Sequence, residues 1–398
     1  MKTIGIICEC NPFHGGHEYL IRRARESGAE AVVCVMSGSF VQRGEAAIVD
    51  AQTRARALLS GGADAVLELP YPFCAAGAEF FARAGVEILD RLCVSELWFG
   101  SECGDVDLLA RLADAADSEE LRTRYAMTAS GNNGTAEAYF DALCDVAGVE
   151  HACASNDILG ISYLRAIRAL QSEMRAVTVK REGSAYLEQS ISKDSFPSAT
   201  ALRRRWREEG LDAILPFLPP AAAEVYAMAN APIADMTRAD RLILGYLRLA
   251  DSETLENVAE LGGGLGNRLS ELALQSASLS ELLTRAATKK YTNARLQRGI
   301  LFALTGIFAA DLRVSPAYVR LLAANQRGCD FLAWARKHAT IDVVTRRADL
   351  PSTPEALRQA EWERRAWSLY TLCREEIEGT DALWKNGVYI DKSPLFPK

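Results

Sequence analysis

Two histidines, His14 and His17, stand three residues apart with Gly15 and Gly16 between them. An imidazole can donate a hydrogen bond to a phosphoryl oxygen, and glycines let a polyphosphate approach the backbone closely. This pair therefore suits a displacement at the α-phosphate of a nucleotide, in which negative charge builds up on the phosphoryl oxygens. The alternative interpretation is a helix N-terminus that carries two solvated histidines.

The elements around the pair favour the chemical interpretation. An apolar run begins at Ile4 and stops near Cys10, because Pro12 excludes further strand pairing and pushes Asn11 away from the helical region. Helical periodicity starts after the glycines. The histidines are therefore expected at a strand-to-helix turn, where unpaired backbone N–H groups and the helix dipole attract phosphate.

The first half of the chain alternates strands and helices, which predicts a Rossmann-like α/β fold with a parallel sheet. Strands are predicted at 31–36, 65–69, 96–99 and 175–181, and helices at 50–59, 77–92 and 155–170. Ligands of such sheets bind beyond the carboxyl ends of the strands. Four segments are expected there: Cys10–His17, Ser37–Gly44, Glu68–Pro70 and Gly100–Glu102.

Several polar residues near these strand ends have more than one interpretation. Arg43 suits an anion clamp or a surface turn, and Glu68 and Glu102 are either functional carboxylates or structurally paired ones. Either Ser155 or Asn156 is expected to cap the helix that follows. Lys180 and Arg181 are expected on the ligand side, at the carboxyl end of their strand.

A second helix N-terminus, at Ser198-Ala199-Thr200, carries two hydroxyl groups, and Arg203 follows one turn later. The His-x-Gly-His spacing and this Ser-Ala-Thr-x-x-Arg sequence resemble the two phosphate-binding signatures of the nucleotidyltransferase and class I aminoacyl-tRNA synthetase superfamily. Two such signatures in this order around one sheet favour nucleotide chemistry.

Length and composition indicate a globular protein of more than one domain. The 398 residues include 49% hydrophobic and 24% charged residues, and the net charge is −7. We predict two domains, a nucleotidyltransferase-like catalytic domain over 1–231 and an α-helical domain over 232–398. The expectation is a cytoplasmic protein without a membrane span, because no apolar run approaches the roughly 18 residues of a spanning helix and the ten cysteines lack a secretory signal. With four histidines and no Cys-x-x-Cys, no resident metal site is expected.

The helical region contains a basic segment. No acidic residue occurs between Leu282 and Ala310, and the predicted RNA-contacting side chains cluster there: Lys289, Lys290, Tyr291, Arg295 and Arg298. An ordinary solvated helix face is the alternative. The glycine-rich segment 262–266 is interpreted as a flexible loop, because no strand precedes it.

The motifs together resemble the bacterial tRNA(Met) cytidine acetate ligase family over roughly the first 300 residues. They are Glu9-x-Asn11-Pro12-Phe13-His14-x-Gly16-His17, Val35-Met36-Ser37-Gly38-x-Phe40-x-Gln42-Arg43-Gly44-Glu45, Leu67-Glu68-Leu69-Pro70, Phe99-Gly100-Ser101-Glu102, Asn156-x-Ile158-Leu159-Gly160, Ser198-Ala199-Thr200 and Lys289-Lys290-Tyr291-Thr292-x-x-Arg295-Leu296-x-Arg298. The resemblance implies an enzyme that activates acetate with ATP as acetyl-adenylate. It would then acetylate the exocyclic amine of the wobble cytidine in elongator tRNA(Met).

The resemblance also implies an ATP site. Carried over residue by residue, it comprises Ile7, Cys8, Glu9, Cys10, Asn11, Pro12, Phe13, His14, Gly15, Gly16, His17, Glu18, Tyr19, Leu20, Gly100, Asn156 and Arg181. The expected catalytic residues are His14, His17, Thr200 and Arg203, and Mg²⁺ is expected to arrive with ATP. Cys10 stands where the family usually has an aromatic residue, and Gly15 where asparagine is common.

Two other functions remain open at this point. A small-molecule adenylyltransferase would share both phosphate signatures without needing a helical RNA domain. A non-catalytic tRNA-binding protein would use the basic segment and tolerate loss of the histidines.

Overall fold

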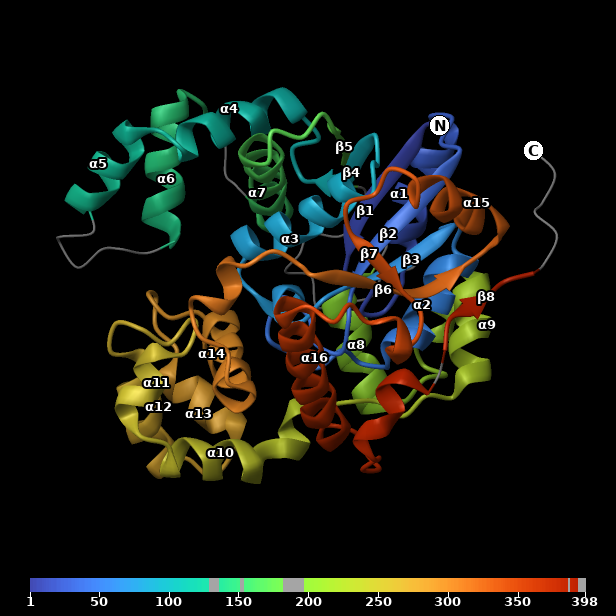
Figure 1. The fold of residues 1–398 in the computed structure, drawn as a ribbon. Coiled ribbons are helices and arrows are strands. Elements are labelled where there is room, and N and C mark those ends of the chain that lie inside the picture. The colour runs from blue at the N-terminus through green and yellow to red at the C-terminus, as the bar shows by residue number, and fades with distance from the viewer. Residues whose placement is uncertain (129–135, 151–153, 182–196, 386, 393–398) are drawn as a thin grey trace.

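One mixed sheet forms the centre of the molecule (Figure 1). The structure is a computed structural model that describes residues 1–128, 136–150, 154–181, 197–385 and 387–392. The strand order is β5-β4-β1-β2-β3-β6-β7, and β8 pairs with β6. The strands are β1 (Thr3–Cys8), β2 (Ala31–Ser37), β3 (Ala65–Leu69), β4 (Glu96–Ser101), β5 (Arg175–Lys180), β6 (Tyr318–Ala324), β7 (Asp342–Val344) and β8 (Tyr389–Ile390).

The first five strands run parallel, as the alternation of strands and helices predicted. Helices connect and cover them. The α-helices are α1 (Gly15–Glu26), α2 (Ala51–Ser60), α3 (Ala78–Arg91), α4 (Val106–Ala116), α5 (Glu119–Thr128), α6 (Ala136–Ala147), α7 (Ser155–Ala169), α8 (Ala199–Glu209), α9 (Pro220–Ala229), α10 (Asp240–Leu249), α11 (Ser252–Asn257), α12 (Leu265–Leu274), α13 (Leu279–Ala286), α14 (Asn293–Thr305), α15 (Gln326–Ala335) and α16 (Pro354–Leu372). The predicted α/β fold is confirmed.

Alternate residues of β1 enter two different cores, because neighbouring side chains of a strand point to opposite faces. Ile4 and Ile6 belong to the core that contains residues of α1, α2, α8 and α9. Ile7 belongs to the larger core, which contains residues of α3, α4 and α7 and of the helices between α10 and α16. Both faces of β1 are therefore buried, which explains its continuous apolar sequence.

The chain after residue 231 is not wholly helical, which corrects the expectation for this part. Strands β6, β7 and β8 lie there, and β6 pairs antiparallel with β3, with Glu68 opposite Arg320. The Arg320 guanidinium bonds to the Glu68 carboxylate, so Glu68 is a structurally paired residue. An unpaired β3 edge would expose backbone groups, and β6 covers it. The predicted boundary at residue 231 stays a prediction.

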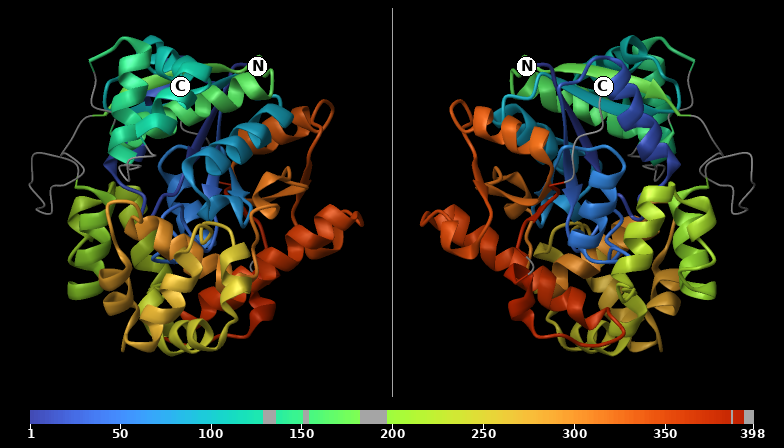
Figure 2. Two further views of the ribbon diagram at one scale, coloured as in Figure 1. Left: turned by 90° about the vertical axis from the view of Figure 1, so that its left-hand side faces the viewer. Right: turned by 90° about the vertical axis from the view of Figure 1, so that its right-hand side faces the viewer.

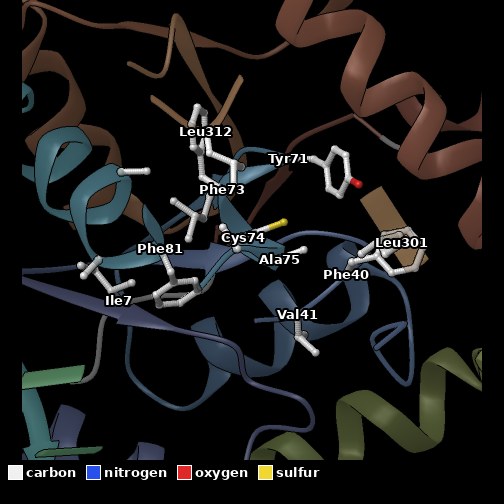
Figure 3. Packing of buried hydrophobic residues seen from close by; sticks show 14 of the residues in the cluster. Ile7, Phe40, Val41, Tyr71, Phe73, Cys74, Ala75, Phe81, Leu301 and Leu312 are labelled. Atoms are coloured by element: carbon white, nitrogen blue, oxygen red, sulfur yellow. The ribbon is translucent and has the colours of Figure 1, made fainter. Parts of the chain in front are cut away.

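Helices α10 to α14 group together at one side of the molecule, and α16 runs alongside them (Figures 1 and 2). Aromatic residues join this group to the loops that follow β2 and β3: Phe40 and Tyr71 belong to the same buried cluster as Leu301 of α14 (Figure 3). The Tyr71 ring lies 6.2 Å from both Phe40 and Phe302, and the Tyr71 hydroxyl hydrogen-bonds with Thr305 of α14. The loops at the ligand end of the sheet are thus held by the helical region.

Candidate active site

A cavity opens beyond the carboxyl ends of β1, β4 and β5, where a parallel sheet binds its ligands. Its walls come from the turn into α1, the loop after β2, and the N-terminal ends of α7 and α8. Among the predicted site residues, these line it: Ile7, Cys8, Glu9, Cys10, Asn11, His14, Gly16, His17, Tyr19, Leu20, Gly100, Asn156, Arg181, Thr200 and Arg203. Pro12, Phe13, Gly15 and Glu18 are not in the lining, and Phe13 is fully buried in the core.

The two histidines cap α1 reciprocally. His14 is the N-cap residue, and its Nδ1 accepts a hydrogen bond from the Gly16 backbone N–H at 3.1 Å. Nδ1 of His17 accepts from the His14 backbone N–H at 3.3 Å. The ring centroids are 4.1 Å apart. A Cβ at position 16 would lie 2.9 Å from His14 Cε1, so glycine is needed at Gly16 for this close packing.

These contacts fix the tautomer of each ring. A neutral imidazole that accepts at Nδ1 carries its proton at Nε2, so both histidines have one N–H left to donate. Burial lowers the pKa of His14 well below its usual value, with His17, Arg181 and Arg203 adding to the effect. Burial also lowers the pKa of His17, to about 4. The pair therefore provides two neutral donors near physiological pH.

Arg203 connects α8 to the turn before α1. Its Nη1 donates to the Asn11 carbonyl at 2.9 Å, and its Nη2 lies 3.4 Å from Thr200 Oγ1 and 3.4 Å from Glu45 Oε2. Ser198 caps α8 by accepting from the Ala201 N–H. Both predicted phosphate signatures thus reach one cavity, and Arg203 holds them together.

The cavity wall contains unpaired hydrogen-bond donors. Three of its residues carry a buried nitrogen without a hydrogen-bond partner in the described structure, namely Asn11 Nδ2, Gln42 Nε2 and Arg203 Nε. Buried polar groups are normally satisfied, so unpaired donors indicate where a ligand with acceptor oxygens binds. Lys180 and Arg181 line the same cavity, as their place at the end of β5 predicted. The site therefore suits an anionic ligand, within a chain of net charge −7.

Asn156 is held by a reciprocal pair of carboxylates. The Glu102 carboxylate accepts from the backbone N–H groups of Asn156 and Asp157 and from the Asn156 amide. Asp157 accepts in return from the Glu102 backbone N–H. The predicted cap by Ser155 or Asn156 was wrong, because Ala154 occupies the N-cap position and Glu102, which directly follows β4, accepts from the N–H groups of the first turn.

The sequence reasoning missed Arg54, whose side chain is fully buried on α2. Its guanidinium donates to the carbonyls of Glu9 at 2.7 Å, Ser37 at 3.0 Å and Val49 at 3.0 Å, and also to that of Gly38. It thereby joins the segments that follow β1 and β2. A charged residue in a helical pattern resembles a solvated one, so the sequence carried no signal for this role.

The predicted RNA-contacting residues lie together beside the glycine-rich segment. The Tyr291 ring has Lys290 Nζ and the Arg295 guanidinium each 5.3 Å from its centroid, and its hydroxyl donates to the Gly263 carbonyl at 3.1 Å. Tyr291 thus organises the surrounding cations through cation–π contacts.

The cations of this segment differ in their partners. Arg298 pairs with Glu260 at 2.9 Å, and Arg295 donates to the Glu260 carbonyl at 3.0 Å. Lys289 and Lys290 are both exposed. These two lysines are therefore the members best placed to meet a polyanion.

Two structural features are absent from the part of the chain that is described. No group of three or more His, Cys, Asp or Glu side chains there is arranged to hold a metal ion. None of its helices combines the length and the apolar character that crossing a bilayer requires.

Comparison with known proteins identifies relatives that match most of the chain. The model of the HIGH Nucleotidyl Transferase family matches residues 1–382. The tRNA(Met) cytidine acetate ligase of Syntrophotalea carbinolica is 35% identical over 87% of this chain and 85% of its own length. That of Listeria monocytogenes is 33% identical, over 94% and 96%. Thermotoga maritima TmcAL has the same fold in an apo crystal structure (TM-score 0.89, 27% identity, 99% and 100% covered) and with alpha-thio ATP bound (TM-score 0.87, the same identity and coverage).

Proposed function

Since the chain belongs to the tRNA(Met) cytidine acetate ligase family, we propose that it activates acetate with ATP and acetylates the wobble cytidine of elongator tRNA(Met). The main observation that supports the ATP-dependent step is the histidine pair. Both rings line the cavity, and each has an Nε2–H group that is available to donate a hydrogen bond. The family relationship supplies the acceptor, because residues around an anion site do not specify an RNA.

The activation step joins two anions, acetate and the triphosphate of ATP. Positioning and electrostatic stabilisation perform such phosphoryl chemistry without a covalent protein intermediate. His14 and His17 are proposed to donate to the oxygens of the reacting phosphates, with Arg181 and the N-terminal end of α8 supplying further positive potential. Mg²⁺ is treated as part of the substrate, bound to ATP. The products of this step are acetyl-adenylate and pyrophosphate.

In the second step, the cytidine amine attacks the acetyl carbonyl and AMP leaves. The mixed anhydride is already activated, so a cysteine nucleophile is unnecessary. Lys289 and Lys290 are proposed to bind phosphates of the tRNA. A bacterial tRNA is a cytoplasmic molecule, so we expect the protein to act in the cytoplasm.

The test is to incubate the protein with ATP, isotopically labelled acetate and total bacterial tRNA, and to digest the tRNA and identify labelled nucleosides. The expected product is labelled N4-acetylcytidine from elongator tRNA(Met). Label in a nucleotide conjugate but not in RNA would favour a small-molecule adenylyltransferase. Binding of tRNA without any labelled product would favour a non-catalytic RNA-binding protein.

A further inference from the structure

Glu9 is the single carboxylate among the described residues that line the cavity. It follows β1 directly, and its Oε1 accepts a hydrogen bond from the Gln42 backbone N–H at 2.9 Å. A carboxylate repels both acetate and a triphosphate, so its presence in a site for two anions requires another reason. Proton transfer during the second step supplies one.

The other bases in the cavity are already engaged. The Nδ1 lone pairs of His14 and His17 accept the backbone N–H groups that cap α1, and their Nε2 atoms carry protons. Either ring would have to break its cap to accept a proton. Cys8 Sγ is engaged too, because it accepts a hydrogen bond from Cys10 Sγ at 3.5 Å, and burial raises the pKa of Cys10, which keeps that thiol protonated. Glu9 therefore remains as the group that can accept a proton without loss of local structure.

We propose that Glu9 is the general base of the transfer step, an inference that rests on the acetate ligase function proposed above. The N4 amine of cytidine attacks the carbonyl carbon of acetyl-adenylate and forms the C–N bond, and the amine proton passes to the Glu9 carboxylate. The C–O bond to the phosphate then breaks, and AMP departs with its electron pair. Solvent receives the proton from Glu9 before the next turnover.

The surroundings of Glu9 keep it suitable for this role. Arg203 of α8 and Arg43 of the loop after β2 favour its charged form, whereas Glu45 of the same loop opposes it, and Tyr163 of α7 also faces it. Burial outweighs the cations and raises the pKa of Glu9. A base gains proton affinity as its pKa approaches the working pH. The transfer rate should therefore rise with pH through the Glu9 pKa and then level off.

The experiment separates the two steps in Glu9→Gln, in which the amide oxygen still accepts from Gln42. Single-turnover transfer from supplied acetyl-adenylate to tRNA should fall about 10²-fold or more, and at least about tenfold further than acetate-dependent ATP–pyrophosphate exchange does. The rise of the transfer rate with pH, which is the acid limb of its pH profile, should disappear in this variant. Glu26→Gln removes the same charge from the exposed face of α1 and should behave as wild type.

Glu9→Asp provides a second variant if the amide variant does not fold. It should transfer at an intermediate rate and keep an acid limb at a shifted pH. Wild-type transfer by Glu9→Gln, or an equal loss of exchange and transfer in both variants, would overturn the role of Glu9 as a base. If the wild-type protein itself transfers no acetyl group, the proposed function fails, which is a distinguishable result.

Discussion

At the scale of residues, each histidine of the pair combines a structural and a chemical task. Nδ1 satisfies a helix N–H group, and this contact leaves the Nε2–H group to donate. A substitution at either position therefore removes both a cap and a donor. The two effects can be separated because a cap contributes about 1 kcal/mol to stability, whereas a preorganised donor to transition-state charge affects the rate by orders of magnitude.

We predict that His17→Ala lowers acetate-dependent ATP–pyrophosphate exchange about 10²- to 10³-fold, because one donor to the developing charge is lost. Its affinity for tRNA should change little, since His17 faces the cavity and not the basic segment. The matched control is His338→Ala, which removes an exposed imidazole that packs on Trp334. Exchange by His17→Ala within threefold of wild type would place the catalytic centre elsewhere.

The rate of acetate activation should not fall as the pH drops through the ordinary pKa of histidine. Burial lowers the pKa values of His14 and His17, so both rings stay neutral as the pH falls through the ordinary imidazole pKa. With saturating Mg²⁺ and acetate, the exchange rate should be flat between about pH 6 and pH 8. It should decline only as the pH approaches the His17 pKa of about 4. An acid limb centred near 6.5 would show that the neutral-donor account is wrong.

The two histidines could be recognised from the sequence, but the partners of other residues around the cavity could not. The spacing of His14 and His17 predicted a helix start because it depends on neighbouring residues alone. Glu102 was recognised as a carboxylate in need of a partner, but its acceptance of the α7 N–H groups depends on how β4 and α7 pack. The role of Arg54 likewise depends on carbonyls contributed by three separate segments.

At the scale of elements, the loop after β2 is fixed by α14. Gly44 has a φ of +75°, and a Cβ there would lie 2.5 Å from the Arg298 backbone nitrogen and 2.6 Å from the Gln297 carbonyl carbon. The same loop carries Gln42, whose N–H group binds Glu9. The position of the helical region therefore affects the wall of the cavity.

We predict that Gly44→Ala lowers the free energy of unfolding by about 2 kcal/mol more than Gly28→Ala does. Both positions have a left-handed backbone, so both variants share the conformational cost of a Cβ, but nothing lies within 4 Å of a Cβ at Gly28. Urea unfolding of the two variants measures the difference. Equal losses would mean that the contact between the loop and α14 adapts without cost.

Strands and helices were predicted correctly where the pattern lies in their own sequence. They were missed where pairing with a distant strand sets the conformation. Strand β3 was expected over its observed range, Ala65–Leu69, because a mostly apolar run of five residues ends at Pro70. Strand β6 has the sequence YVRLLAA, which has little β-branched character, and it was not predicted. Its conformation is set by pairing with β3 and by the Arg320–Glu68 ion pair, which lie 252 residues apart in the chain.

At the scale of the whole molecule, two groups of basic residues have different proposed ligands on a chain of net charge −7. One group lines the cavity, and the other surrounds Tyr291. Contact between tRNA phosphates and lysines releases counterions, which makes affinity depend on salt. The two sites should therefore respond differently when their charges are removed.

We predict that the double substitution Lys289→Ala and Lys290→Ala weakens tRNA binding and lowers the slope of log K against log salt by up to roughly two units. Exchange of ATP and pyrophosphate should persist, because these lysines lie outside the cavity lining. Arg336→Ala with Lys337→Ala removes two exposed cations near the end of α15 and serves as the charge-matched control. An unchanged affinity and slope in the first variant would identify the segment as solvated surface.

The central claim, that acetate is activated as an adenylate, is tested most directly by following oxygen from acetate. If the acetate oxygen attacks the α-phosphate, and the amine later cleaves the C–O bond, that oxygen stays on AMP. The reaction with ¹⁸O-labelled acetate, ATP and tRNA should therefore give AMP that carries one ¹⁸O atom, together with unlabelled pyrophosphate. Label in inorganic phosphate, with ADP as the nucleotide product, would contradict the account.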